Sequence, residues 1–400
     1  MTATVAPGSR RQRLGELARL FLRIGLTGFG GPAVTIAMMQ DEVVTRRGWL
    51  SRERFLDLMG LTNLIPGPNA AEMSIHIGYV CGGWAGLAVA GACFILPAAI
   101  MTTLLAWAYV TYGALPRVAP LLYGIKPAVI AVVLAALWRL GRTAVRSWQM
   151  AVIGAGVIAL ALVGVDEILA MFIGGIVGGL WLRLPALRRD RRPPTALAAA
   201  LLALVEPGAL AAPALATPAI AAAAPSLLKL ALFLLKTGAV LYGSGYVLVA
   251  FLEAGLVRDY GWLTQQQLLD AIAAGQFTPG PLLSTSAFVG YLLFGLPGAA
   301  VSTLAVFLPS FIFVVAISVL MPNPRRSPWT SAFLDAINVS SLALMAIVTV
   351  QLGRAALGDW PTCVIAAAAA VVGLRWKVNS AWLVLGGALA GWLAHWLGLA

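Results

Sequence analysis

The chain has 400 residues, of which 60% are hydrophobic and only 10% are charged, and its mean hydropathy is +0.91. A soluble globular domain averages about 25% charged residues, so this composition excludes that class and indicates a protein that crosses a membrane several times. Two stretches without Asp, Glu, Lys or Arg, residues 73–116 and 271–324, each exceed the roughly 20 residues that a helix needs to span a bilayer.

The net charge of +12 comes largely from arginines in short clusters between apolar segments. This arrangement is typical of cytoplasmic loops under the positive-inside rule, so the expected partner is the lipid bilayer and not nucleic acid. The three cysteines, Cys81, Cys93 and Cys363, show no paired spacing, and the two histidines, His76 and His395, lie far apart. We therefore expect no disulfide framework, no metal site and no cofactor.

Apolar segments alternate with short charged loops along the chain. In the first part they are expected at 17–39, 55–83, 84–113, 120–138, 150–165 and 168–182. A basic run follows at 183–194, and the Ala/Pro-rich stretch 195–224 either spans the membrane once or merely connects. The expected organisation is a basic N-terminal tail (1–16), a first membrane repeat (17–182), a basic linker with an Ala/Pro-rich connecting span (183–225) and a second membrane repeat (226–400).

Pro-Gly-Pro sequences interrupt two apolar segments, at 66–68 and 279–281, and they lie 213 residues apart. Other positions keep this offset, for example Gly25 with Gly238. Behind the breaks a one-residue deletion changes the offset to 212, as for Pro97 with Pro309. Many such coincidences of Gly, Pro and Trp in one register indicate an internal duplication.

Loop charges indicate how the two repeats are oriented. Residues 40–54 hold four arginines, whereas the equivalent residues 253–267 hold one. By the positive-inside rule the first loop is cytoplasmic and the second is not. The expected fold is therefore an all-α polytopic membrane protein, with two inverted-topology repeats and Gly/Pro-broken or re-entrant helices, and 195–224 spans once to invert the second repeat.

The two breaks are the expected substrate site. Broken helices in matching positions of two halves are the best sequence pointer to a transporter's binding site. Helix N-termini after each break would present free N–H groups to an anion, and the second break continues with three hydroxyl side chains at 284–286. Such uncharged donors suit an oxyanion better than a metal cation. The alternative is that the prolines only kink packed helices and the hydroxyls bond back to the backbone.

Two cations, Arg23 and Lys236, occupy equivalent positions inside apolar segments. Ionisable residues at membrane depth are costly, so a functional role is the default hypothesis, and the pair would converge on one dianion. The alternative is that each side chain extends to the membrane interface.

Polar residues gather behind the first break. Glu72 is a candidate for proton coupling, and His76, four residues on, shares its helix face and would relay or tune that proton. A paired polar bridge between helices is the alternative. The equivalent acids Asp57 and Asp270 lie near segment starts, where an acid favours the helix dipole, and we expect them to be structural.

The candidate functional residues form two sets, without a catalytic residue or metal ligand. The substrate-binding candidates are Arg23, Gly30, Gly31, Pro66, Gly67, Pro68, Asn69, Lys236, Gly243, Pro279, Gly280, Pro281, Ser284, Thr285 and Ser286, and the proton-coupling candidates are Glu72 and His76.

Several motifs carry a family resemblance. FLRIGLTGFGGPAV, GWLSRERFLDLMGLTNLIPGPNA and GYVCGGWAGLAVAGACFILP stand in the first half; GAVLYGSGYV, GWLTQQQLLDAIAAGQFTPGPLLSTSAFVGY and LPGAAVSTLAVFLPSF stand in the second. Together the chain resembles the bacterial chromate ion transporter family in its long form with two homologous halves. The second half departs from the first at Ser244-Gly245 in place of Gly31-Pro32, and at Leu282 in place of Asn69, so the halves are not expected to bind substrate equivalently.

The resemblance implies a multi-pass carrier of the bacterial inner membrane that moves chromate, and also sulfate, outward; a homodimer is one assembly it allows. The N-terminus is expected in the cytoplasm. We expect a secondary transporter and no enzyme, because no nucleotide-binding GxxxxGK[ST] motif is present. The alternatives are a transporter or channel for another small anion, or an intramembrane enzyme.

Overall fold

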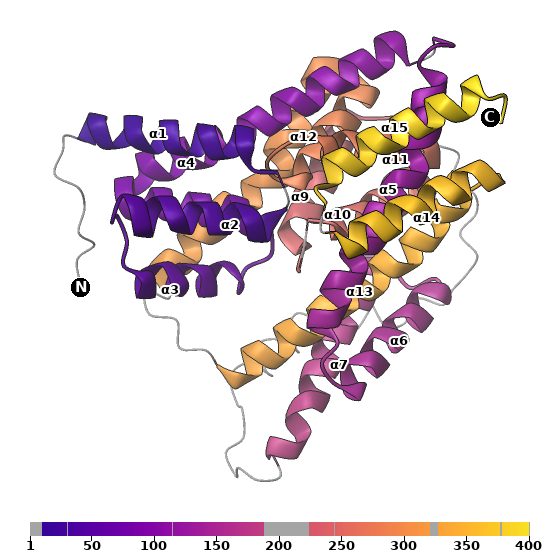
Figure 1. Cartoon of the computed structure of the whole chain (residues 1–400). Coiled ribbons are helices and arrows are strands. Elements are labelled where there is room, and N and C mark those ends of the chain that lie inside the picture. The colour runs from indigo at the N-terminus through magenta and orange to yellow at the C-terminus, as the bar shows by residue number, and fades with distance from the viewer. Residues whose placement is uncertain are drawn as a thin grey trace.

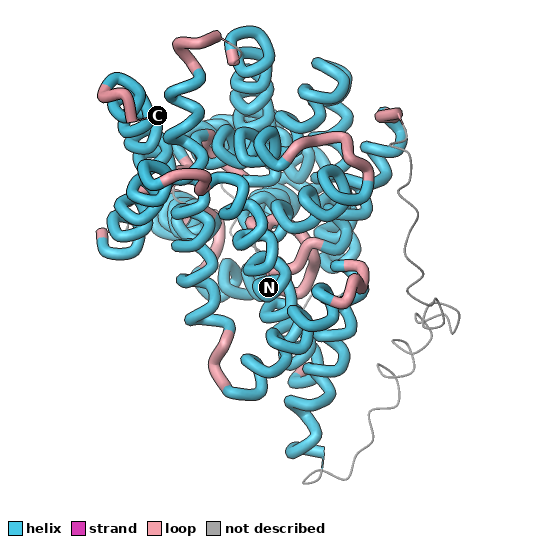
Figure 2. The backbone as a smooth tube through the Cα atoms, turned by 90° about the vertical axis from the view of Figure 1, so that its right-hand side faces the viewer, coloured by secondary structure: helices cyan, strands magenta, loops and turns pink. Residues whose placement is uncertain are grey.

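The computed structural model describes residues 10–29, 31–113, 115–187, 224–243, 245–320, 327–376 and 378–399. Every regular element in these ranges is a helix (Figures 1 and 2), which confirms the all-α class. Four helical stretches are long and apolar enough to cross a membrane: Asn69–Tyr112, Ala119–Ala144, Leu282–Val319 and Pro328–Ala356. The stretch 195–224, expected to span once, lies outside the described residues.

The helices of the first half begin at the basic end of the chain. They are α1 (Arg10–Thr27), α2 (Pro32–Gln40), the π-helix η1 (Asp41–Arg46), α3 (Arg52–Thr62), α4 (Asn69–Tyr112), α5 (Ala119–Ala144), α6 (Trp148–Leu162) and α7 (Glu167–Leu187).

The second half repeats this order. Its helices are α9 (Leu227–Val240), α10 (Val247–Leu252), the π-helix η2 (Glu253–Asp259), α11 (Gln265–Phe277), the short 3₁₀-helix η3 (Leu282–Ser284), α12 (Thr285–Leu320), α13 (Pro328–Ala356), α14 (Trp360–Arg375) and α15 (Ser380–Trp396). Equivalent side chains start equivalent helices: the Ser51 hydroxyl accepts from Arg54 N at 3.2 Å, and the Thr264 hydroxyl accepts from Gln267 N at 3.1 Å.

Both longest helices are hairpins and not straight rods. Gly83 (φ 60°) and its repeat equivalent Gly295 (φ 62°) lie outside the helical region of backbone conformation. In α4 the Cβ position of Gly78 meets the carbonyl of Gly86, although an uninterrupted helix would place these residues about 12 Å apart. Each chain therefore folds back on itself, with a short first arm after the break and a second arm long enough to span.

The two halves are held together by reciprocal backbone hydrogen bonds at the breaks. Gly67 N donates to Leu241 O at 2.7 Å, and Gly280 N donates to Gly28 O at 3.2 Å. Gly280 is 213 positions after Gly67 and Leu241 is 213 positions after Gly28, so the second bond is the first with the halves exchanged. Such reciprocity is characteristic of two equivalent units related by a two-fold axis.

The long helices of each half pack against the other half. Helix α5 packs against α14 and α15, whereas α13 packs against α6 and α7, and Figure 1 shows these as two separate groups. Small residues permit the close approach of α5 and α15: the Cβ position of Gly124 would meet the carbonyl of Gly387 and lie 2.6 Å from Gly391 Cα. This small-xxx-small pattern is typical of helix pairs in membranes.

We predict that Gly78→Ala lowers the thermal unfolding midpoint of the protein in detergent. The added methyl group would overlap the carbonyl of Gly86 and lie 2.6 Å from Ala90 Cβ, and overpacking of this kind costs about 1–3 kcal/mol. Gly141→Ala is the control, because a Cβ at this α5 position meets nothing within 4 Å. Equal midpoints for both variants would contradict the hairpin contact.

Candidate functional site

A cavity of about 430 Å³ lies between the two halves, at the breaks. The first half lines it from the α1–α2 connection, from the residues after the first break and from α5; the second half lines it from α11, the second break and the start of α15. The lining residues are Gly28, Phe29, Gly31, Pro32, Val34, Thr35, Pro68, Ala70, Arg139, Gly245, Tyr246, Gly275, Gln276, Thr278, Gly280, Pro281, Leu282, Leu283, Val378, Asn379 and Ser380. The volume is sufficient for a small oxyanion with part of its hydration shell.

Gln276 is the most telling polar group of this lining. Its side chain amide is buried, and Nε2 has no hydrogen-bond partner among the described residues. Its Oε1 accepts from the Tyr246 hydroxyl at 3.4 Å, and this contact leaves the N–H groups of the amide available. Buried polar groups are nearly always hydrogen-bonded, so an unpartnered donor at a cavity wall favours a ligand that accepts hydrogen bonds.

Hydroxyl groups cluster where the second break meets α4. Thr102 Oγ1 donates to Ala98 O at 2.7 Å and lies 3.2 Å from Ser284 Oγ and 3.4 Å from Thr278 Oγ1. Thr285 Oγ1 is buried without a partner in the described part of the chain. Of these side chains Thr278 reaches the cavity lining, and the others stand behind it.

Ser286 behaves differently from its neighbours. It is fully buried, and its hydroxyl donates to Leu283 O at 2.7 Å, the backbone bond that the kink alternative expects. The three hydroxyls at 284–286 thus face different partners.

Arg139 is the cationic residue of the lining, and the sequence reading missed it as a site residue. It lies near the end of α5, is exposed, and its Nε donates to Ala135 O at 3.2 Å. In the sequence it reads as one of several arginines that mark a loop. Its repeat equivalent, at an offset of 212, is Gln351, so the positive charge belongs to one end of the cavity only.

The first break holds a buried acid instead of a donor cluster. Glu72 is fully buried, and both carboxyl oxygens lack a partner among the described residues. At Gly67 a Cβ would meet Glu72 Oε1 and lie 2.8 Å from Ser310 Oγ of α12, which is also buried and unpartnered. His76 is fully buried as well, with Nδ1 at 3.3 Å from Ser318 Oγ, again on α12.

The two breaks differ further at positions that the duplication pairs. Asn69 Nδ2 donates to Asn63 Oδ1 at 2.8 Å, which closes both side chains on each other. Their equivalents are Leu282 and Gln276, and the leucine offers no such partner to the amide. The donor of the second break therefore stays free because its partner position is apolar.

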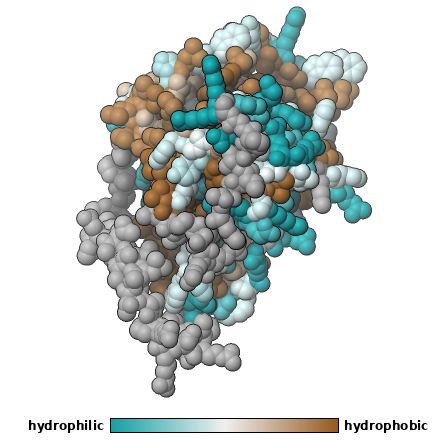
Figure 3. Space-filling view, turned by 90° about the vertical axis from the view of Figure 1, so that its left-hand side faces the viewer, coloured by the Kyte–Doolittle hydropathy of each residue, from teal (hydrophilic) through white to brown (hydrophobic). Residues whose placement is uncertain are grey.

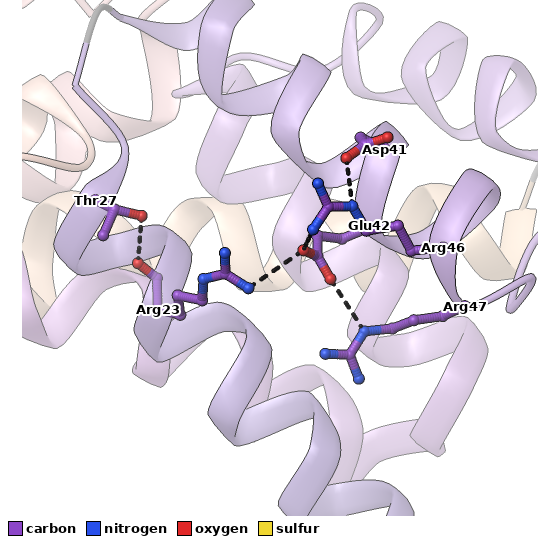
Figure 4. A network of polar contacts seen from close by, with 6 residues as sticks. All are labelled: Arg23, Thr27, Asp41, Glu42, Arg46 and Arg47. Carbon is purple, nitrogen blue, oxygen red and sulfur yellow. Dashed lines mark hydrogen bonds and ion pairs between the residues drawn. The ribbon is translucent and has the colours of Figure 1, made fainter.

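Arg23 lies on the surface of α1, where it forms an ion pair with Glu42 (Figure 4). Arg23 Nη1 is 3.3 Å from Glu42 Oε1, and Arg46 Nη1 and Arg47 Nε reach the same carboxylate at 3.3 Å. The Glu42 side chain is only 12% exposed, whereas that of Arg23 is 63% exposed. Figure 3 shows the side of the molecule on which α1 to α3 lie, with hydrophilic residues gathered over part of it.

Lys236 is exposed on α9, and none of the ion pairs between described residues includes it. The position equivalent to Glu42 is Gly255, so the partner of Arg23 has no counterpart in the second half. Neither Arg23 nor Lys236 is among the described residues that line the cavity.

The remaining candidates are divided. Gly31, Pro68, Gly280 and Pro281 line the cavity. Gly243 borders a smaller cavity of about 150 Å³, which also includes Asn338. Pro66, Gly67, Asn69 and Pro279 form or flank the breaks outside the lining, and Gly30 lies outside the described residues.

These features define a class: a multi-pass helical membrane protein whose duplicated halves enclose a cavity at their helix breaks. Comparison with known proteins gives the family. The family described as "Chromate transporter" matches residues 15–179 and 228–392, one match in each half, and the chain therefore belongs to the chromate transporter family. It is a transporter and not an enzyme.

Three curated relatives extend over nearly the whole chain. The "Probable chromate transport protein" of Synechococcus elongatus is 32% identical, over 92% of this chain and 91% of the relative. The "Chromate transport protein" of Cupriavidus metallidurans is 31% identical, over 96% and 93%, and that of Pseudomonas aeruginosa is 31% identical, over 94% and 92%. No solved structure matches.

Proposed function

We propose that this chain exports chromate across the bacterial inner membrane as a secondary transporter, and that sulfate competes for the same site. The observation that carries the proposal is the cavity between the breaks, with an unpartnered buried amide donor and a single cationic lining residue. The relatives named chromate transport proteins supply the substrate class. Two identical tetrahedral dianions of similar size would meet the same donors, so the geometry favours the class over one member.

The anion is held by hydrogen bonds and by one positive charge. Gln276 donates through its free N–H groups, Thr278 adds a hydroxyl, and the backbone at Gly280 and Pro281 forms the wall. Arg139 at the cavity edge offsets part of the charge of a dianion. Fixed donors in a low-dielectric surrounding replace the water shell, because each hydrogen bond to a charged group contributes about 1.5–3 kcal/mol.

We propose inverted repeats, with the N-terminus in the cytoplasm. In this topology the 113–118 loop and the start of α11 share the outer face, as do the α6–α7 loop and η2. Contacts between these regions support it: the Tyr109 hydroxyl donates to Asp270 at 3.0 Å, and Arg258 pairs with Glu167 at 2.7 Å. Parallel repeats would place each pair at opposite membrane faces. The repeat boundaries 17–182 and 226–400 belong to the same proposal.

The described state is then open to the cytoplasm. Arg139 and the start of α15, which contribute to one side of the cavity, lie at the inner face in this topology. An inside-negative potential drives a dianion outward, with about 2.3 kcal/mol per charge per 100 mV. Rocking of one half against the other about the reciprocal bonds of the breaks would expose the anion to the opposite side.

The proposal keeps three further parts. Glu72 and His76 carry the coupling proton at the first break, where a lone buried carboxylate charge would be costly and the neutral acid is accommodated. Arg23 and Lys236 guide the anion from the ends of α1 and α9, where they lie. Two copies of the chain form a homodimer in the membrane.

Everted membrane vesicles containing the protein should take up chromate in a saturable, potential-dependent way that sulfate inhibits. The expected site variants are Gln276→Leu and Arg139→Gln. Gln276→Leu should raise the half-saturating chromate concentration about tenfold or more, since it removes a donor to a charged ligand. Arg139→Gln should lower uptake most at low ionic strength, because exposed charges are screened by salt.

Arg142→Gln is the matched control, since this arginine lies three residues further along α5 and outside the described lining of the cavity. Its uptake should equal that of the wild type. Uptake no higher than in empty vesicles would reject chromate as the substrate. Normal half-saturation in Gln276→Leu would move the binding site away from the second break.

Arg23→Gln and Lys236→Gln should each reduce chromate flux while the amount of folded protein stays the same. The effect should diminish with added salt, because both side chains are exposed and act at a distance. Normal flux in both variants would end the paired-cation hypothesis and leave Arg23 as the partner of Glu42.

Glu72→Gln should abolish the dependence of chromate flux on pH, because the amide cannot gain or lose the proton. Flux is measured in vesicles over a series of pH values, beside Glu53→Gln, an exposed acid of α3, as control. An unchanged pH profile would return Glu72 to a structural role.

A further inference from the structure

A charged triad outside the cavity joins the two halves near the start of α11. Asp270 is 5% exposed, and its Oδ2 accepts from the Tyr109 hydroxyl of α4 at 3.0 Å. The same oxygen lies 3.8 Å from Lys126 Nζ of α5, whose side chain is 21% exposed. Helices α4 and α5 belong to the first half and α11 to the second, so the triad spans the boundary between them.

The triad leaves one oxygen free. Asp270 Oδ1 is buried and has no partner among the described residues, and both contacts converge on Oδ2. Lys126 and Tyr109 are the charged or titratable groups that act on this carboxyl in the described part of the chain. A buried ion pair is stable only when further hydrogen bonds satisfy its remaining lone pairs, and here they do not. A proton on Oδ1 would be added without the loss of an existing bond.

Comparison with the other repeat separates this triad from a general feature of the fold. Asp57, the equivalent of Asp270, is exposed on α3 and takes part in none of the ion pairs between described residues. The position equivalent to Lys126 is Asn338. The two acids look alike in the sequence, and only one is buried against a cation.

The triad is coupled by rigid helices to the cavity. Helix α4 contacts the second half at two places about two turns apart: Tyr109 at Asp270, and Thr102 at Thr278. Thr278 lines the cavity, and Gln276 lies on α11 six residues after Asp270. A change in the bond at Asp270 therefore acts on the helix that presents the anion's donors.

We propose that Asp270 is a proton-binding site, read by Lys126 and Tyr109, that couples proton movement to the alternation of the two halves. The proton adds to Oδ1 and turns the carboxylate into the neutral acid. Lys126 keeps its ammonium charge but loses its counter-charge, so the attachment of α5 to α11 weakens. Release of the proton restores the pair. The coupling to chromate rests on the proposed function, in which Glu72 and Asp270 act in series, one at each break.

The transport test uses the full chain in proteoliposomes, with chromate exchange and chromate-driven proton movement measured separately. Asp270→Asn should retain exchange and lose proton movement, and Asp57→Asn should match the wild type in both. Normal proton movement in Asp270→Asn would overturn the proposal. So would loss of exchange and of folded protein in Asp270→Asn that Asp270→Asn/Lys126→Met restores, because that pattern identifies a purely structural ion pair.

A second measurement does not depend on any substrate. Infrared difference spectra between high and low pH should show the carbonyl stretch of a protonated carboxylic acid that is present in wild type and Asp57→Asn and absent in Asp270→Asn. Identical spectra for all three proteins would overturn the proton site. If the band is present and chromate flux is absent, the proton site stands and the proposed substrate fails.

Discussion

The structure depends on how the backbone is satisfied where its helices break inside an apolar protein. Lipid offers no hydrogen bonds, so every N–H and C=O freed at a break must find a partner within the protein. Gly67 and Gly280 solve this across the boundary of the halves, each donating to the carbonyl at the end of the other half's first helix. The breaks thus hold the halves together, and the cavity lies beside these bonds.

The duplication provides the frame, and the departures from it provide the chemistry. Equivalent positions carry a free amide and hydroxyls at one break, and a buried acid with an unpartnered hydroxyl at the other. Two identical breaks would offer identical surroundings to anion and proton. Because Leu282 replaces Asn69, the amide of Gln276 is left without the partner that Asn63 has. The asymmetry is what allows one site to differ from the other.

Charge is placed with the same economy. Arg23, Arg46 and Arg47 converge on Glu42 at the surface, and Arg258 joins Glu167 between the halves. Inside the packed helices the described acids are few, and each is either paired, as Asp270 is, or unpartnered, as Glu72 is. Since charges within a membrane are costly, these few positions are where ionic chemistry concentrates.

The sequence by itself determined the helical membrane class, the duplication, the two breaks and the family, because these rest on local composition and on Gly and Pro spacing. It also separated the segments at Gly83, where the chain does fold back. Burial and partners were decided only by the tertiary structure. Asp57 and Asp270 occupy equivalent positions in sequence, but one is exposed and the other meets Lys126; Arg139 reads as a loop residue and lines the cavity. These outcomes depend on which helix of the other half packs alongside, and long-range packing leaves no periodic trace in the chain.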